Sequence, residues 1–77
     1  MTTTLSITDV KNDEGTWFWT VTDEAGSTRM KTNRNGEGYW SQKSETEWRQ
    51  QAGTCQFSLA GKSMAAARAY LRRQFAN

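Results

Sequence analysis

Gly61-Lys62-Ser63 has the residue types that end a phosphate-binding loop, in which backbone amides hold phosphates and the lysine reaches the terminal ones. The complete pattern also needs a glycine five positions before Gly61, and this chain has Gln56 there. We therefore interpret the three residues as a strand-to-helix turn, with Ser63 as the N-cap of the helix that follows.

Other residue types that catalyse reactions lack the partners they need. Cys55 is the single cysteine, and the chain has no histidine to activate it, so we expect a buried structural thiol. Glu45 and Glu47 lie two positions apart and would diverge on a helix, which makes them a poor acid–base pair. Zinc sites depend on cysteine and histidine and are excluded. The sequence predicts no catalysis, no metal and no cofactor.

A binding surface is indicated instead by aromatic residues that lie beside bases. The chain has four Trp, three Phe and two Tyr, and we expect most of them in the core because large aromatics dominate small domains. Phe18 differs, since it has the opposite strand parity to Trp17 and Trp19 and would lie outside, near Arg29 and Lys31. Bases around an exposed ring suit nucleic-acid stacking with phosphate neutralisation. They equally suit an Arg-rich protein interface.

Two further groups complete the candidate site. Arg68 and Arg72 lie four positions apart on one flank of the last predicted helix, where a solvated helix edge is the alternative interpretation. Tyr39 is a candidate anchor for a protein partner. The predicted binding residues are Phe18, Arg29, Lys31, Arg34, Tyr39, Arg68 and Arg72.

A meander of four strands is expected to position the first of these residues. Period-two alternation of apolar and polar residues predicts strands around residues 5–7, 17–22, 27–34 and 39–42. Polar turns separate the first three, and Asn35-Gly36 predicts a tight hairpin turn, after which residues 39–42 return antiparallel to the third strand.

The second half of the chain is expected to add two helices and a strand. Ser44 and Glu47 have the spacing of a capping box, which predicts a short helix that stops at Gly53. Residues 54–59 alternate again and predict a fifth strand whose inward side chains are Cys55, Phe57 and Leu59.

The last helix is expected over residues 63–75. Its apolar stripe is Met64, Ala67, Leu71 and Phe75, which would pack on the sheet. The predicted fold is therefore α+β: an antiparallel meander of four to five strands, a short helix before the last strand, and a C-terminal helix packed on one sheet face. Residues 1–77 form a single domain, since no linker or repeat divides the chain.

Acidic and basic residues are sorted along the chain. Residues 1–24 contain five acids and one base, whereas residues 48–77 contain five bases and no acid. This asymmetry favours a polyanionic or acidic partner. Because the net charge of the 77 residues is only +2, the attraction must come from a local patch.

The Trp-rich meander, followed by Phe57 and a helix that begins Ser63-Met64-Ala65-Ala66-Ala67-Arg68-Ala69-Tyr70, resembles two groups of sheet-plus-helix DNA-binding domains. These are the domains of plant ethylene-response factors and the arm-binding domains of phage integrases. In both, the sheet lies in the major groove, so the resemblance implies DNA contacts by Trp17, Trp19, Arg29 and Lys31. The chain departs from the pattern at Asn35-Gly36, in residues 44–53, and by its acids around the first turn.

In size and style the chain is also similar to small inhibitors encoded by phages and mobile elements, including anti-CRISPR proteins, which occupy the surface of nucleic-acid-handling complexes. The predicted function is therefore a non-enzymatic binding protein that blocks a host complex, such as a CRISPR effector, by surface occupation. The alternative is a direct DNA-binding module that uses the basic and aromatic sheet face and the C-terminal helix; an oligomer-forming accessory protein is a third class.

The expected partners follow from this function. They are a protein or nucleoprotein complex, with nucleic acid itself as the alternative, and no membrane. No stretch approaches the roughly 18 apolar residues of a membrane span, and the first residues lack the basic and apolar regions of a signal peptide. We expect a cytoplasmic protein of a phage-infected or prophage-carrying bacterium.

Overall fold

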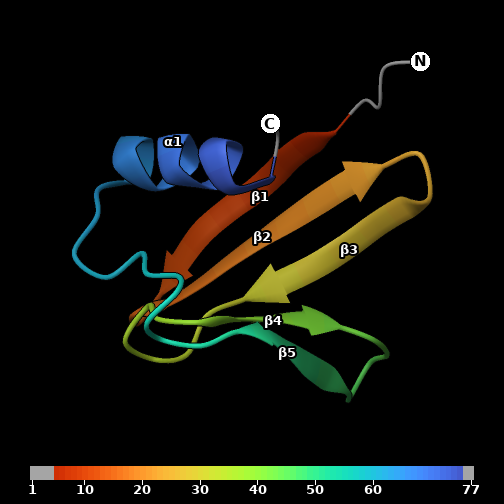
Figure 1. The fold of residues 1–77 in the computed structure, drawn as a ribbon, viewed down its shortest axis with the longest axis horizontal. Coiled ribbons are helices and arrows are strands. Elements are labelled where there is room, and N and C mark those ends of the chain that lie inside the picture. The colour runs from red at the N-terminus through yellow and green to blue at the C-terminus, as the bar shows by residue number, and fades with distance from the viewer. Residues whose placement is uncertain (1–4, 76–77) are drawn as a thin grey trace.

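The computed structural model describes residues 5–75, which form one five-stranded antiparallel sheet and one helix (Figure 1). The elements are β1 (Ser6–Asp13), β2 (Thr16–Asp23), β3 (Gly26–Lys31), β4 (Tyr39–Gln42), β5 (Trp48–Ala52) and α1 (Met64–Phe75). The strands lie in the sheet in chain order, so each pairs with the next. The prediction of an α+β fold with an antiparallel meander and a C-terminal helix is confirmed.

Short polar turns join the first three strands where they were expected. The backbone N–H of Gly15 donates to Oδ1 of Asn12 over 3.0 Å, and Glu14 and Gly15 both have positive φ, of 53° and 97°. Two consecutive residues in this conformation form the tight turn whose twist matches that of the flanking strands. In the next turn, Oδ1 of Asp23 accepts from the backbone N–H of Ala25 over 2.8 Å.

The connection from β3 to β4 is longer than the predicted two-residue turn. The third strand ends at Lys31 and not at Arg34, because Oδ1 of Asn33 accepts hydrogen bonds from the N–H groups of Asn35 and Glu37, at 2.8 and 3.0 Å. Such side-chain bonds compete with the ladder bonds of a strand. The predicted antiparallel return of the fourth strand is nevertheless confirmed.

The helix predicted from the Ser44 to Glu47 spacing is wrong, because this segment closes a hairpin and continues as β5. The backbone N–H groups of Lys43 and Ser44 both donate to the carbonyl of Glu47, over 2.8 and 3.3 Å. A helix this short is marginal unless it packs an apolar stripe on the core. The strand satisfies the backbone groups along the free edge of β4 instead.

The fifth strand predicted over residues 54–59 is also wrong. These residues form a turn and an extended connection, and the N–H of Gly38 donates to the carbonyl of Phe57 over 2.7 Å. Phe57 and Leu59 are buried as expected. Cys55 lies in the turn and is exposed, so the prediction of a buried thiol is contradicted.

Helix α1 covers the inner face of the sheet through part of its predicted stripe. Ala67 and Leu71 are completely buried, whereas Met64, which was expected to be buried with them, is 37% exposed. It lies in the first turn of the helix, before α1 reaches the core. Ser63 is the N-cap, as predicted, since its Oγ accepts from the N–H of Ala66 over 3.2 Å.

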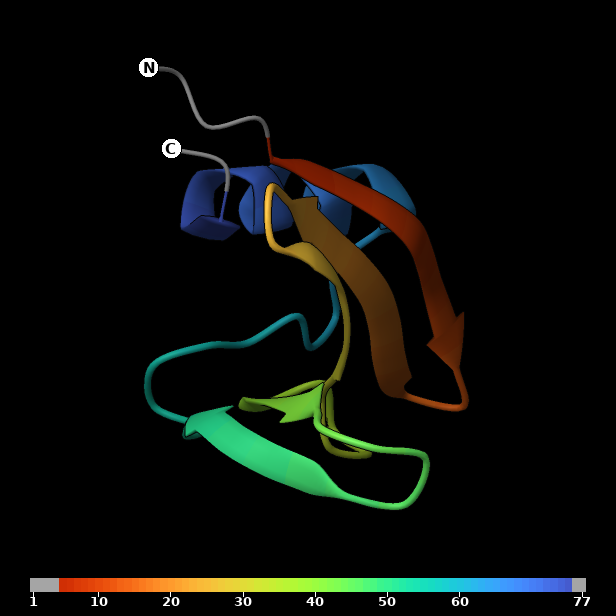
Figure 2. The same ribbon diagram turned by 90° about the vertical axis from the view of Figure 1, so that its right-hand side faces the viewer.

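The core lies between α1 and the inner face, and it is largely aromatic. Trp19 stacks on Phe57 with ring centroids 5.5 Å apart, and Phe57 also contacts Tyr70 edge-on at 5.2 Å. Figure 2 shows β4 and β5 turned away from β1 and β2, so the sheet is strongly bent. Within residues 5–75, no helix is long and apolar enough to cross a membrane. The buried apolar residues are Trp17, Trp19, Val21, Phe57, Leu59, Ala67 and Leu71.

Candidate functional site

The register of the sheet brings cations and aromatic rings into one row across it. Lys11 pairs with Phe18, and Phe18 pairs with Lys31 on its other side. Lys31 in turn pairs with Trp40. Directly paired residues of an antiparallel sheet project to the same face. Because Phe18 alternates with the buried Trp19, this row lies on the face opposite the core.

Two more side chains join the row through strand periodicity. Arg29 lies two residues before Lys31 on β3, and Trp48 lies two residues before Gln50, which pairs with Trp40. Cations and rings therefore alternate across four strands. We call this surface the outer face; it carries Lys11, Phe18, Arg29, Lys31, Trp40 and Trp48.

The cations of the outer face lie against its own aromatic rings. The Nζ atom of Lys31 is 4.5 Å from the ring centroid of Trp48. The guanidinium carbon of Arg29 and the Nζ of Lys11 lie 5.6 and 5.7 Å from the ring centroid of Phe18. Each such contact contributes about 0.5–1 kcal/mol at an exposed site, which orients the side chains but does not lock them.

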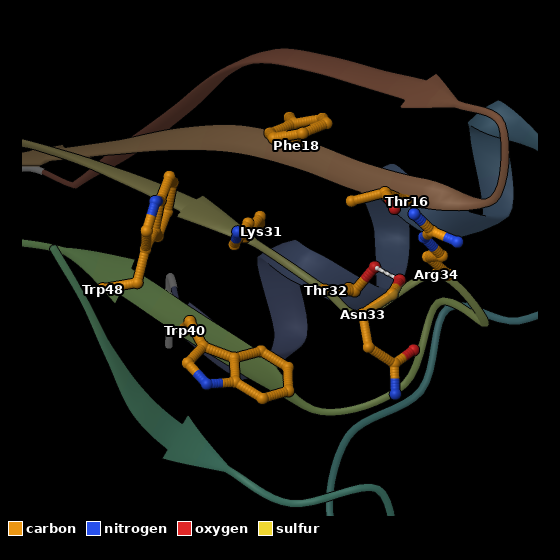
Figure 3. Close-up of a pocket in the computed structure, with 8 residues that line it drawn as sticks. All are labelled: Thr16, Phe18, Lys31, Thr32, Asn33, Arg34, Trp40 and Trp48. Carbon is orange, nitrogen blue, oxygen red and sulfur yellow. Dashed lines mark hydrogen bonds between the residues drawn. The ribbon is translucent and has the colours of Figure 1, made fainter. Parts of the chain in front are cut away.

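A hollow of about 510 Å³ opens in the outer face, where Phe18, Trp40 and Trp48 are arranged around Lys31 (Figure 3). Its other end is formed by the β3–β4 connection, in which Oγ1 of Thr32 donates to the carbonyl of Asn33 over 2.9 Å. This volume is within the range of about 300–1,000 Å³ that holds small organic ligands. The hollow combines flat apolar walls with a cation, which suits a planar ligand that carries negative charge.

Arg34 lies at the edge of this hollow, beside the acids of the first turn. It lines the 510 Å³ hollow and also a neighbouring hollow of about 370 Å³, which Asp13 and Glu14 share. The outer face is therefore positive over its centre and acidic at one end. A long polyanion that crossed this end would be repelled by the two carboxylates.

Tyr39, the candidate anchor for a protein partner, does not belong to the outer face. Its ring contacts those of Phe57 and Phe75 on the inner face, at centroid distances of 4.7 and 5.2 Å. Burial raises the pKa of the Tyr39 phenol above its ordinary value, because desolvation disfavours the phenolate.

Arg68 and Arg72 lie apart from the other predicted site residues. They line a separate hollow of about 270 Å³ with Asp9, which has a positive φ of 55° in a bulge of β1. The structure thus brings Phe18, Arg29, Lys31 and Arg34 together and leaves the two helix arginines on another surface.

Sequence reasoning missed the two tryptophans of the outer face. The signal for Trp40 was present, because it follows Tyr39 on one strand, and the two must point to opposite faces. Trp48 was hidden by the incorrect helix between Ser44 and Gly53, since its face is defined only once the strand is paired with β4.

The residues that resemble the end of a phosphate-binding loop do not line the hollow of this surface. Lys62 rests on Tyr70, with its Nζ 4.9 Å from the ring centroid, and Gly61 has a positive φ of 71° in the turn before α1. Among residues 5–75, no three Cys, Asp or Glu side chains come together as a group that could hold a metal ion. The candidate binding surface of the described residues is therefore the outer face.

No protein-family model, curated protein or solved structure matches this chain. Of the four residues that the resemblance to sheet-plus-helix DNA-binding domains implies as contacts, Arg29 and Lys31 lie on the outer face. Trp17 and Trp19 are 4% and 0% exposed and are not available for contacts with DNA.

Proposed function

We propose that this protein is a non-enzymatic binding protein that blocks a nucleic-acid-handling complex of a bacterial host, such as a CRISPR effector, by occupying one of its surfaces. The observation that supports this proposal is the outer face, where half-buried Phe18, Trp40 and Trp48 alternate with cations. Large aromatic residues and arginine supply most of the binding energy at protein surfaces. In the absence of a partner, this surface stays partly exposed to water.

The charge of the outer face favours a target that handles nucleic acid. Lys11 projects from β1, and Arg29 and Lys31 project from β3, on either side of Phe18 on β2. Together these cations create a local positive field although the net charge is only +2. Complexes that handle nucleic acid present phosphates, which such a field attracts.

A direct nucleic-acid-binding module is the second candidate, because bases and rings are interleaved on one face. Sheet proteins that bind nucleic acid use aromatic rings for base stacking and neighbouring cations for phosphates. Both candidates use the same residues. The two candidates predict different results after nuclease treatment: a protein partner stays bound, whereas a nucleic-acid partner is lost.

The test is affinity capture from lysate of a bacterium that carries the candidate complex, with and without nuclease. We expect the wild-type protein to retain subunits of one complex after nuclease treatment, and Arg29→Glu on the outer face to lose them. Arg73→Glu is the matched control, since Arg73 is exposed on α1 and does not line the hollow. Equal capture by Arg29→Glu would contradict the proposal, and capture that depends entirely on intact nucleic acid would make the second candidate the primary function.

A further inference from the structure

The outer face offers separated stacking surfaces rather than one continuous apolar patch. Phe18 and Trp40 flank Lys31 from the two neighbouring strands, so their backbones are two strand spacings apart, or about 10 Å. Successive nucleotides of a duplex strand rise by only about 3.4 Å. Neighbouring bases are therefore too close together to reach both rings while they stay stacked. The faces of all stacked bases are also covered by their neighbours, so bases that stack on the rings must leave their own stack, which a single strand permits.

We propose that the outer face binds a single strand of nucleic acid, with one base in the hollow against Trp40 and Trp48 and another on Phe18, while Arg29, Lys31 and Arg34 neutralise the phosphates. The inference rests on the proposed function in one respect, namely that the outer face is the binding surface. It adds the chemical class of the ligand, whether the strand is free or is displayed by a larger complex.

The hollow fits a base better than it fits a protein side chain. Its walls are aromatic rings, and its volume of about 510 Å³ exceeds what one side chain would fill. The cation at its centre is Lys31, and lysine is depleted in the cores of protein–protein interfaces. A base can stack on the rings while its phosphate pairs with the lysine.

The cation–π contacts hold the cations beside the rings, from where they can turn to phosphates. Lys31 lies on Trp48 at 4.5 Å, and no such contact is formed by the ring of Trp40 among the described residues. Arg29 and Lys11 lie at 5.6 and 5.7 Å from Phe18, close to the outer limit of about 6 Å for this interaction. A base can displace these weak contacts while the released cations turn to its phosphates.

A duplex fits the outer face poorly. Five strands measure about 19 Å along the strongly bent sheet, whereas the major groove of B-form DNA is about 12 Å wide. Asp13 and Glu14 would also meet one of the two phosphate backbones at the acidic end of the face. A single strand has one backbone and can leave the face before it reaches these acids.

The experiment titrates the purified full-length protein with a thymidine oligonucleotide of about 12 nucleotides, a length typical of single-strand sites, and with a duplex of equal length. Binding is followed by fluorescence anisotropy of a labelled strand and by quenching of tryptophan emission. We expect the single strand to bind more tightly than the duplex. Trp40→Ala and Trp48→Ala should each weaken binding about 5- to 150-fold, the range for loss of one stacked base.

Two further variants keep the test independent of folding. Trp40→Phe retains an aromatic surface and should bind nearly as well as the wild type, whereas Arg73→Gln removes an exposed cation of α1 and should leave binding unchanged. Thermal unfolding of each variant shows whether the sheet is intact. Equal loss of affinity in Trp40→Phe and Trp40→Ala, with unfolding unchanged, would overturn the stacking assignment.

The remaining outcomes separate this inference from the proposed function. Binding to the duplex as tight as to the single strand overturns the inference. If neither oligonucleotide binds at low salt but Trp40→Ala abolishes capture of a host complex, the inference is wrong and the proposed function stands. If neither oligonucleotide binds and the outer-face variants capture the same complex as the wild type, both are wrong.

Discussion

Adjacent residues Tyr39 and Trp40 have opposite roles although both are large aromatics on one short strand. Tyr39 points inward and contacts the rings of Phe57 and Phe75. Trp40 points outward beside Lys31 and lines the hollow. Strand geometry alone requires this separation, because successive side chains project to opposite faces. Whether an aromatic residue can bind a partner therefore depends on which face of the strand it projects from.

The inward position of Tyr39 predicts a pH dependence of stability. Burial raises the pKa of its phenol, so the folded state retains the proton at pH values where the unfolded state has begun to lose it. The stabilisation is complete below the unfolded pKa of about 10 and is lost as pH rises through the folded pKa. The free energy of unfolding should therefore fall more steeply above about pH 10 in the wild type than in Tyr39→Phe. Parallel curves from urea unfolding would contradict the assignment.

Gly38 and Gly61 form a matched pair for a second prediction. Both have a positive φ, of 64° and 71°, so alanine at either position adopts a strained backbone at a cost of about 1–2 kcal/mol. A Cβ atom at Gly38 would lie 2.9 Å from the carbonyl oxygen of Ala52, whereas a Cβ at Gly61 meets no described atom within 4 Å. Gly38→Ala should therefore destabilise the protein more than Gly61→Ala. Equal losses in denaturant midpoint would show that the junction of β4 and β5 can relax.

At the scale of elements, α1 stabilises the fold by covering the inner face of the sheet. Leu71 is completely buried among the core residues. Leu71→Ala should lower the free energy of unfolding by about 2–5 kcal/mol, a large part of the 5–15 kcal/mol typical of small domains. Gln74→Ala, at an exposed position of the same helix, is the control and should change stability little. An unchanged thermal midpoint in Leu71→Ala would show that the helix does not cover the core.

The segment from Ser44 to Ala52 shows why local signals can mislead. The Ser44 to Glu47 spacing is that of a capping box, but the same residues close the β4–β5 hairpin through bonds to the Glu47 carbonyl. Helix capping contributes about 1 kcal/mol, whereas a paired strand satisfies several backbone groups of β4 at once. The strand also places Trp48 on the outer face beside Lys31.

At the scale of the whole molecule, folding rearranges the charge sorting seen along the chain. Arg68 and Arg72 were expected to share a binding surface with Phe18, Arg29 and Lys31, but they line a separate hollow beside β1. The cations of the outer face come from the first half of the chain, which is acidic overall up to residue 24. A linear charge count cannot reveal this arrangement, because turns project the acids to the ends of strands while periodicity gathers the bases on one face.

The arrangement of charge over the whole molecule predicts how the affinity for nucleic acid depends on salt concentration. Each phosphate contact releases condensed counterions, so the logarithm of affinity for a single strand should fall with the logarithm of salt concentration by about 0.7 per contact. Arg29→Gln and Lys31→Gln should each lower this slope by about that amount, and Arg73→Gln should not. For duplex DNA we expect binding at or above about micromolar at physiological salt, as for non-specific binders.

Two results would contradict this expectation. A shallow slope, with large losses confined to a few anchors such as Phe18, would indicate a protein partner. Nanomolar, sequence-selective binding to a short duplex would make the direct DNA-binding candidate the primary function.

The residue pattern was sufficient for the first three strands, the C-terminal helix and the position of Phe18 on the face opposite the core. Each depends on periodicity over neighbouring residues: alternation placed Phe18 opposite Trp19, and helical spacing brought Ala67 and Leu71 onto one stripe. Ser63 was recognisable as an N-cap for the same reason, since its partner Ala66 is three residues away. Sequence patterns between neighbouring residues remain valid in any tertiary structure that contains the same helix or strand.

Only the tertiary structure decided the second half of the sheet and the composition of the outer face. Whether residues 48–52 form a helix or a strand depends on the free edge of β4, and Cys55 is exposed because residues 54–59 bond to a distant loop instead of a strand. The meeting of Lys31 with Trp48 requires three paired strands. Pairing between distant segments is a property of the whole fold, because backbone groups take the partners that leave the fewest of them unsatisfied.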